Sequence, residues 1–357
     1  MNAPFEGLPP QSEAQPLLAA ALADPGHAYL FSGPAGTGKR RYAEHFAAAL
    51  LESRLGRIET RAHPDLFVLE AEGGSILIDH ARELRRDLHM RPFEADRRVY
   101  MILDAHLLRT ESANALLKSL EEPPAYAVFV LVSDHAEGML PTIRSRVVPI
   151  TFRRLSSAQL TELTGDAVAA RAALGDAGRA QRLASDPESA ERRRTYLALA
   201  RASLVDPEFD PGAAAQVITD AASARSAQAQ KQIEQEAAPQ LEGVEDARQR
   251  KALEKRIEDR AKRTARRAQM EEVRDAVDMV ALWYRDLMAA AIGADGTVVN
   301  LDLSGELIDD ARRCAPVDAA RAVLVVSEAR RTLETNVQPA LAVEAMFHRL
   351  RLAPAGS

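Results

Sequence analysis

The stretch "HAYLFSGPAGTGKR", from His27 to Arg40, decides how the first part of the chain folds. A short apolar run enters a glycine-rich turn, and the next segment spaces Tyr42, Phe46 and Leu50 four residues apart, as an amphipathic helix does. Strand, loop and helix are the setting of the phosphate-binding loop G-x-x-x-x-G-K-[ST], in which backbone N–H groups surround the phosphates. The sequence therefore predicts a phosphate-binding loop over residues 33–39.

The predicted nucleotide site lacks two groups that ATP hydrolysis needs. Arg40 stands where a Ser or Thr hydroxyl would ligate Mg²⁺, and Ala105 follows Asp104 where a glutamate would polarise the attacking water. Thr37 or Ser32 could replace one missing hydroxyl, but the loss of both groups favours a loop that keeps its shape without turnover. We expect no required cofactor and no hydrolysis, and whether ATP binds without turnover stays open. The expected degenerate site is made of Gly33, Gly36, Gly38, Lys39, Asp104, Ser133 and Arg179.

Strand and helix signals alternate through the first 150 or so residues. "RVYMILDAH" (98–106) and "AVFVLVS" (127–133) are continuously apolar, as buried parallel strands are, and Pro123 and Pro124 end a helix between them. Repeated βα units of this kind predict a parallel sheet with helices on both faces. The fold class expected is α/β, with a phosphate-loop sheet domain at residues 1–152.

Beyond Thr151 the strand signals nearly vanish. Short helices are predicted to about residue 188, and longer ones rich in Ala, Leu and Arg follow. We expect a small helical lid at 153–188 and an all-α collar domain at 189–357, with a charged insertion near 220–272.

Composition narrows the class of protein. The chain has 357 residues, a formal charge of -6 and one cysteine, Cys314, which excludes an intramolecular disulfide and a cysteine zinc cluster. Neither a membrane-spanning apolar run nor a signal peptide is evident, so we expect a cytoplasmic protein with no membrane partner and no metal.

Three motifs together resemble a known family. "HAYLFSGPAGTGK", "ANALLKSLEEPP" and "LPTIRSR" (140–146), in this order and spacing, are similar to the AAA+ clamp-loader subunits of bacterial DNA polymerase III. The segment "LETNVQPALAVEAMFHRL" (333–350) resembles the end of the delta-prime subfamily in particular. The resemblance implies an AAA+ domain, a lid and a collar that joins five subunits, including ATPase subunits and delta, into a ring that loads a sliding clamp on primed DNA.

Within that family, delta-prime subunits are usually rigid and non-hydrolysing, in agreement with Arg40 and Ala105. The "TIRSR" motif implies that Arg146 acts as an arginine finger on the ATP of a neighbouring subunit; Arg144 is the nearby competitor, and a surface salt bridge is the plain alternative for Arg146. Ser133 matches a polar sensor position and Arg179 a nucleotide-sensing position of the lid. Many relatives carry four zinc-binding cysteines before the "HPD" element (63–65), which this chain lacks, so a metal-free connection is expected.

Other functions stay open at this point. The chain could be an ATP-hydrolysing clamp-loader subunit, a scaffold with a vestigial finger, or a stand-alone AAA+ motor that remodels nucleic acid. Residues 248–267 hold ten basic and three acidic residues, a local charge of +7. A charge run of this kind is typical of a solvated helix, and the alternative is contact with DNA or an acidic partner protein.

Overall fold

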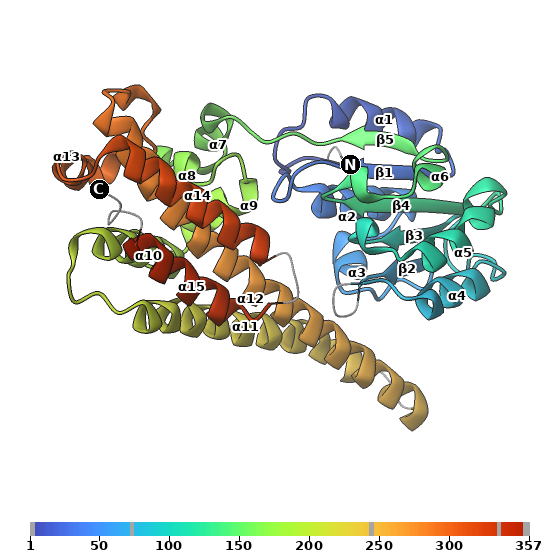
Figure 1. Cartoon of the computed structure of the whole chain (residues 1–357). Helices are drawn as coiled ribbons and strands as arrows, with labels where there is room; N and C mark the ends of the chain where they lie inside the picture. Colours follow the sequence, from blue (N-terminus) through green and yellow to red (C-terminus); the bar gives the residue numbers. More distant parts are fainter. Residues whose placement is uncertain (1–3, 72–74, 243–245, 334–336, 353–357) are drawn as a thin grey trace. The chain divides into compact units, whose positions relative to one another are not determined.

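The computed structural model describes residues 4–71, 75–242, 246–333 and 337–352 (Figure 1). The chain forms two compact units. The first comprises Met1–Gly165 with Ala173–Gln181, and the second comprises Asp166–Ala172 with Arg182–Ser357. The α/β part and the helical part predicted from the sequence are both present.

A five-stranded parallel sheet forms the centre of the first unit, in the order β2-β3-β4-β1-β5. Its strands are β1 (Ala28–Ser32), β2 (Leu66–Leu69), β3 (Arg98–Ile102), β4 (Ala127–Ser133) and β5 (Val148–Thr151). The predicted strands are β1, β3 and β4, whose side chains are almost all buried. Strands β2 and β5 have four residues each, and β5 buries only Ile150. Neither strand has a long apolar run from which it could be predicted.

Helices cover both faces of the sheet, as the alternation of strands and helices predicts. Neighbouring residues of β1 point into different apolar clusters, because side chains alternate across a strand. Phe31 packs in one cluster with α1, α2 and α3, and Leu30 packs in the other with α4, α5 and α6. These helices are α1 (Ala14–Ala23), α2 (Lys39–Leu50), α3 (Leu55–Glu59), α4 (Ile78–Asp87), α5 (Thr110–Glu121) and α6 (Pro141–Arg144).

Hydrogen bonds to a buried carboxylate fix the "HPD" element. The fully buried Asp65 carboxylate accepts hydrogen bonds from the N–H groups of Phe93, Glu94 and Ala95 at 2.6, 2.7 and 2.9 Å. Burial raises the pKa of this carboxyl, but the N–H donors and Arg98 outweigh it, so its pKa lies below the usual value. In the part of the chain that the structure describes, no three His, Cys, Asp or Glu side chains are grouped to hold a metal ion.

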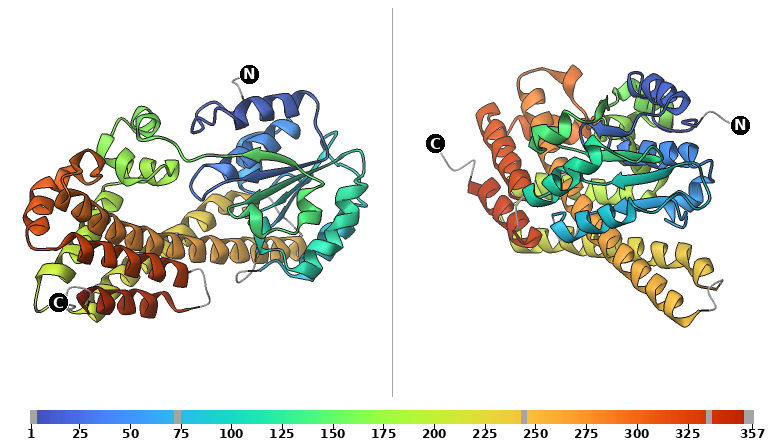
Figure 2. Two further views of the ribbon diagram at one scale, coloured as in Figure 1. Left: turned by 45° about the horizontal axis from the view of Figure 1, so that its top comes forward. Right: turned by 90° about the vertical axis from the view of Figure 1, so that its right-hand side faces the viewer.

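The second unit is helical, and the described residues after β5 contain no strand, as predicted (Figure 2). Three short helices precede the long ones: α7 (Ser157–Thr164) and the first part of α9 (Ala177–Ser185) belong to the first unit, and α8 (Ala167–Ala172) belongs to the second. The long helices and their successors are α10 (Pro187–Val205), α11 (Pro211–Glu242), α12 (Ala247–Ala291), α13 (Ser304–Ala311), α14 (Pro316–Thr332) and α15 (Pro339–Leu352). The predicted charged insertion falls on α11 and α12, whereas the three-domain division at residues 152 and 188 stays a prediction.

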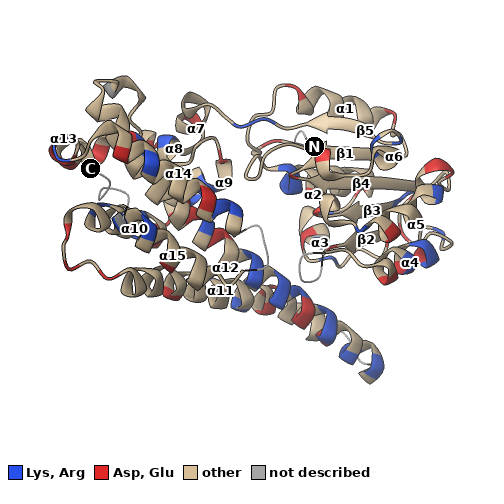
Figure 3. Cartoon of the chain, viewed as in Figure 1, with Lys and Arg blue, Asp and Glu red and all other residues tan. Residues whose placement is uncertain are grey.

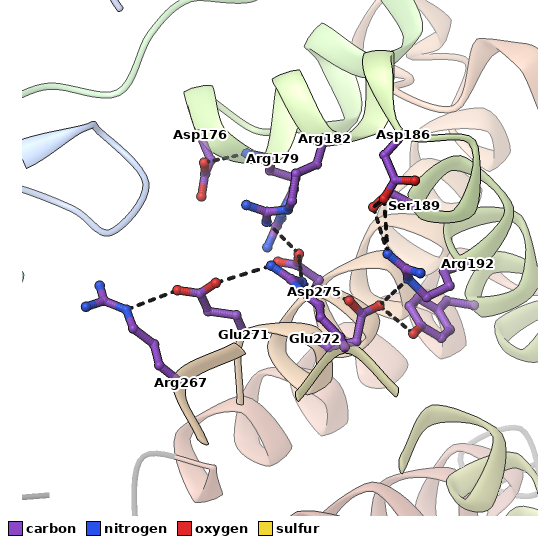
Figure 4. A network of polar contacts seen from close by, with 12 residues as sticks. Asp176, Arg179, Arg182, Asp186, Ser189, Arg192, Arg267, Glu271, Glu272 and Asp275 are labelled. Carbon is purple, nitrogen blue, oxygen red and sulfur yellow. Dashed lines mark hydrogen bonds and ion pairs between the residues drawn. The ribbon is translucent and has the colours of Figure 1, made fainter. Parts of the chain in front are cut away.

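A buried carboxylate joins three of the long helices (Figure 4). Glu272 of α12 is 3% exposed and accepts a hydrogen bond from the Tyr196 hydroxyl of α10 at 2.7 Å. Its carboxylate also pairs with Arg225 of α11 at 2.8 Å and with Arg192 of α10 at 3.1 Å. Burial, and then the nearby Glu272 charge, raise the pKa of Tyr196. This cluster fixes the position at which α11 and α12 leave the body of the unit.

No described helix is both long enough and apolar enough to cross a bilayer.

Candidate functional site

The phosphate-binding loop has the predicted place between β1 and α2. Gly33 has a φ of 147°, and a Cβ there would overlap the carbonyl of Phe152, so only glycine fits. Gly36 has a φ of 78°, and a Cβ there would overlap the carboxylate of Asp176. Gly38 precedes the first residue of α2, Lys39. The loop therefore has the glycines and the lysine of a phosphate cradle in their expected order.

Lys39 is already engaged by groups of its own chain. Its ammonium lies 2.8 Å from the Gly33 carbonyl oxygen, 2.6 Å from the Pro34 carbonyl oxygen and 2.7 Å from Oδ1 of Asp134, and the residue is 4% exposed. A nucleotide phosphate would have to replace at least part of this set to reach the ammonium. Asp134 directly follows β4, and its place after a buried strand is the only sequence signal that could have identified it.

Arg40 does not take over the role of the missing hydroxyl. Its guanidinium lies 3.1 Å from a carboxylate oxygen of Glu44 and 3.2 Å from one of Glu70, which also pairs with Arg61 at 2.6 Å. A guanidinium has no lone pair to offer a cation. The nearby Thr37 hydroxyl is buried and donates to the Pro34 carbonyl at 2.9 Å.

The end of β3 supplies one carboxylate and no second one. Asp104 adopts a left-handed conformation with a φ of 52°. Ala105, which replaces the water-polarising glutamate, is 1% exposed and belongs to the apolar cluster beneath the sheet. A carboxylate at position 105 would have to be buried among apolar side chains.

The two predicted sensor residues lie in different surroundings. The Ser133 hydroxyl is 3.3 Å from Nδ1 of His106 and accepts from the N–H of His135 at 3.2 Å. Burial, opposed by nearby Asp104, lowers the pKa of His106. Arg179, which is 7% exposed, lies in the first turn of α9, where its N–H donates to Asp176 at 2.8 Å (Figure 4).

The start of α9 meets the phosphate-binding loop. The N–H of Ala177 donates to the Gly36 carbonyl at 3.1 Å, and the Asp176 carboxylate lies against Gly36. The structure therefore brings together the loop, Lys39, the first turn of α9 and, at the ends of the adjacent strands β3 and β4, Asp104 and Ser133. The contact of Asp176 with the loop could not be found from the sequence, because 140 residues separate it from Gly36.

Arg146 and this loop lie at opposite ends of the parallel strands. β1 and β5 are parallel neighbours, and the loop follows the end of β1 at Ser32, whereas Arg146 precedes the start of β5 at Val148. One strand length, about 10 Å at ~3.3 Å per residue, separates the two ends. The Arg146 guanidinium is one-third exposed, pairs with Glu121 and donates to the Thr142 carbonyl at 2.8 Å.

Residues 17–156 match the family described as DNA polymerase III, delta subunit. The DNA polymerase III subunit delta′ of Pseudomonas aeruginosa is 40% identical over 136 residues, which are 34% of this chain and 42% of that protein. Residues 17–156 are therefore similar to clamp-loader delta-prime subunits.

Subunits of another name match a similar share of this chain. The DNA polymerase III subunit gamma/tau of Mycobacterium tuberculosis is 37% identical over 142 residues, 36% of this chain and 25% of that protein. The chain thus spans less than half the length of the curated relatives it matches. A gamma subunit-related protein of Thermotoga maritima, 17% identical with a TM-score of 0.49, aligns over 95% of this chain and 99% of that structure.

Proposed function

We propose that this chain is a non-hydrolysing clamp-loader subunit of the delta-prime type. The main support for this proposal is that Arg40 and Ala105 occupy the two positions where ATP hydrolysis needs a hydroxyl and an acid. Arg40 is paired with Glu44 and Glu70, and Ala105 is packed in an apolar cluster, so the site has neither the hydroxyl for Mg²⁺ nor the acid for water. ATP binding to the loop without turnover belongs to this proposal.

The proposed action on a neighbour uses Arg146. A guanidinium stays charged and can bridge two phosphate oxygens, which suits an arginine finger. Its place at the end of the strands remote from its own loop supports a role on the nucleotide of an adjacent subunit. The proposed partners are the ATPase and delta subunits of a pentameric loader and, through them, a sliding clamp and primed DNA.

An ATP-hydrolysing subunit is the second candidate, since gamma/tau and tau proteins also match this chain, at 37% and 33% identity. Two measurements separate the candidates. The isolated chain should release no phosphate from ATP above background, whereas a hydrolysing subunit should show Mg²⁺-dependent turnover that Lys39→Ala abolishes.

The finger is tested in a loader reconstituted with its ATPase and delta subunits. Arg146→Ala should lower the ATPase rate and leave assembly intact, and Arg144→Ala, an exposed arginine on α6, serves as the control. We expect a partial loss, because only one of several ATP sites adjoins this subunit. Undiminished clamp-stimulated ATPase in an assembled Arg146→Ala loader would refute the finger.

A further inference from the structure

The distal parts of α11 and α12 form an arm, residues 226–242 and 247–267. The two helices pair through a thin line of small apolar side chains that includes Ile233, Ala237, Ala261 and Ala265. The arm extends past the other helices of the second unit (Figures 1 and 2). Residues 246–260 contain no buried side chain, so this stretch contributes little to the core of the unit.

Lys and Arg recur along α12 in the arm, with a few Asp and Glu residues among them (Figure 3). The basic stripe comprises Arg248, Lys251, Lys255, Lys262 and Arg266, all exposed. Their spacing of three, four, seven and four residues places them on one side of a helix, opposite the half-buried Leu253 and Ile257. From the first to the last the stripe is about 27 Å long, at 1.5 Å of rise per residue.

Most cations of the stripe form no ion pair with the described residues, although the Glu258 carboxylate interacts electrostatically with Lys255 as well as with Lys262. Lys262 pairs with Glu258 at 2.5 Å, as the four-residue spacing predicts. Among the described residues no carboxylate forms an ion pair with Arg248, Lys251, Lys255 or Arg266. Other acidic residues of the arm pair with its flanks, as Glu254 does with Arg250 and Glu236 with Arg260. Mutual repulsion along the stripe would be relieved by a bound polyanion.

The surface of the arm fits nucleic acid better than a protein. Stable protein interfaces depend on buried aromatic or aliphatic anchors. No large hydrophobic side chain is exposed among the described residues between Val217 and Ile292, and the arm sequence contains no aromatic residue. The absence of stacking side chains also disfavours single strands, which are commonly held by base stacking on aromatics. A straight row of cations suits the regular phosphates of a duplex.

We propose that the basic stripe of the arm binds the phosphate backbone of double-stranded DNA without reading its sequence. The stripe spans about eight base pairs at ~3.4 Å per pair. As a clamp-loader contact this inference rests on the proposed function, since a loader acts where duplex DNA is present. The contact belongs to this chain alone and needs neither ATP nor Arg146, so it can be measured on the isolated protein.

The test is fluorescence anisotropy of the full chain with a labelled 30-base-pair duplex at several NaCl concentrations. The stripe variant replaces Arg248, Lys251, Lys255, Lys262 and Arg266 with Gln. A matched control removes the same charge from exposed arginines elsewhere in the second unit: Arg194, Arg312, Arg313, Arg321 and Arg331 to Gln. Glutamine forms helices nearly as well as lysine and arginine, so both variants should keep the wild-type circular dichroism and melting temperature.

We expect wild-type affinity to fall by about 10²- to 10³-fold between 50 and 200 mM NaCl, as about five phosphate contacts require. The stripe variant should bind at least tenfold more weakly at 100 mM NaCl and lower the salt slope by about 4, and the control should bind nearly as wild type. Equal affinities of the two variants would overturn the proposal. So would preferential binding of a poly-glutamate competitor or of single-stranded DNA.

A loader assembled with the stripe variant separates this proposal from the preceding one. Its ATPase rate without DNA should match that of wild type, because no stripe residue belongs to the nucleotide site. If the stripe variant binds DNA more weakly and Arg146→Ala leaves the ATPase rate unchanged, the DNA-binding proposal for the arm is supported and the arginine-finger proposal is refuted. The reverse pattern would uphold the finger and refute the arm.

Discussion

Lys39 Nζ lies 2.7 Å from Asp134 Oδ1, so the cation that would meet the terminal phosphates of a nucleotide is paired with a carboxylate of its own chain. A phosphate must compete with this carboxylate. We therefore expect Asp134→Asn to raise ATP affinity by roughly tenfold, about 1.4 kcal/mol, because a charge-assisted contact is exchanged for a neutral one.

Binding of a fluorescent ATP analogue to wild type and Asp134→Asn measures this effect, with Lys39→Ala as the control that should bind weakly in either background. Phosphate release should stay at background in all of them. Unchanged affinity in a folded Asp134→Asn protein would mean that the carboxylate does not compete with phosphate.

Ala105 cannot be returned to glutamate without a cost in stability. The side chain is 1% exposed in an apolar cluster, and burial of an unpaired carboxylate there should lower the free energy of unfolding by about 3–5 kcal/mol. Urea unfolding of Ala105→Glu measures the loss. Ala125→Glu, the same change at an exposed alanine, should cost less than about 0.5 kcal/mol.

Arg40→Thr tests the other half of the degenerate site. It restores a hydroxyl at the Mg²⁺ position, yet we expect no ATPase activity from it alone, because the water-polarising acid is still missing. Phosphate release above that of Lys39→Ala would show that the missing hydroxyl is the sole defect.

The nucleotide loop could be predicted because its functional residues are close together in the sequence. The side chains that pack against the loop come from distant segments and could not be predicted. The glycines and Lys39 lie within seven residues, and β1 and α2 flank them in the sequence. Asp176, which lies against Gly36, and Glu70, which pairs with Arg40, come from distant segments whose packing no local pattern encodes. The strand β5 could not be predicted either, because an edge strand with one buried residue has no apolar run.

Asp65 should make the stability of the first unit depend on pH. Its folded-state pKa is lowered, so its stabilising contribution is complete above the unfolded-state pKa of about 3.9 and is lost as pH falls through the lower folded value. Asp65→Asn should cost about 2–4 kcal/mol at pH 7, because the buried Arg98 loses a charge partner and backbone N–H groups lose acceptors. Chemical unfolding of both proteins from pH 7 to pH 3 should show the difference shrinking as pH falls; a constant difference would contradict it.

Glu272 should be a main stabilising residue of the helical unit. Glu272→Leu leaves Arg225 and Arg192 without their buried partner, and we expect a loss of about 3–5 kcal/mol. The adjacent Glu271, 39% exposed at its side chain, is the control, and Glu271→Gln should cost less than about 1 kcal/mol. Thermal or urea unfolding measures both losses. Similar losses in the two variants would show that the buried Glu272 contributes no more stability than the exposed Glu271.

Glu121 should act as a positioning residue for the proposed arginine finger. Its carboxylate pairs with the Arg146 guanidinium, which also contacts the Thr142 carbonyl and the Ser145 hydroxyl, so the arginine is held in place before any partner arrives. Glu121→Gln keeps the charge of Arg146 but loosens its orientation, and we expect the ATPase rate of the reconstituted loader to fall about two- to fivefold, less than with Arg146→Ala. Arg146→Lys should restore little of the ATPase rate that Arg146→Ala loses, because an ammonium cannot contact two phosphate oxygens as a planar guanidinium does. The decisive comparison is the double variant Glu121→Gln with Arg146→Ala: if Glu121 acts through Arg146, the double variant should be no slower than Arg146→Ala alone, and additive losses would show that Glu121 acts by another route.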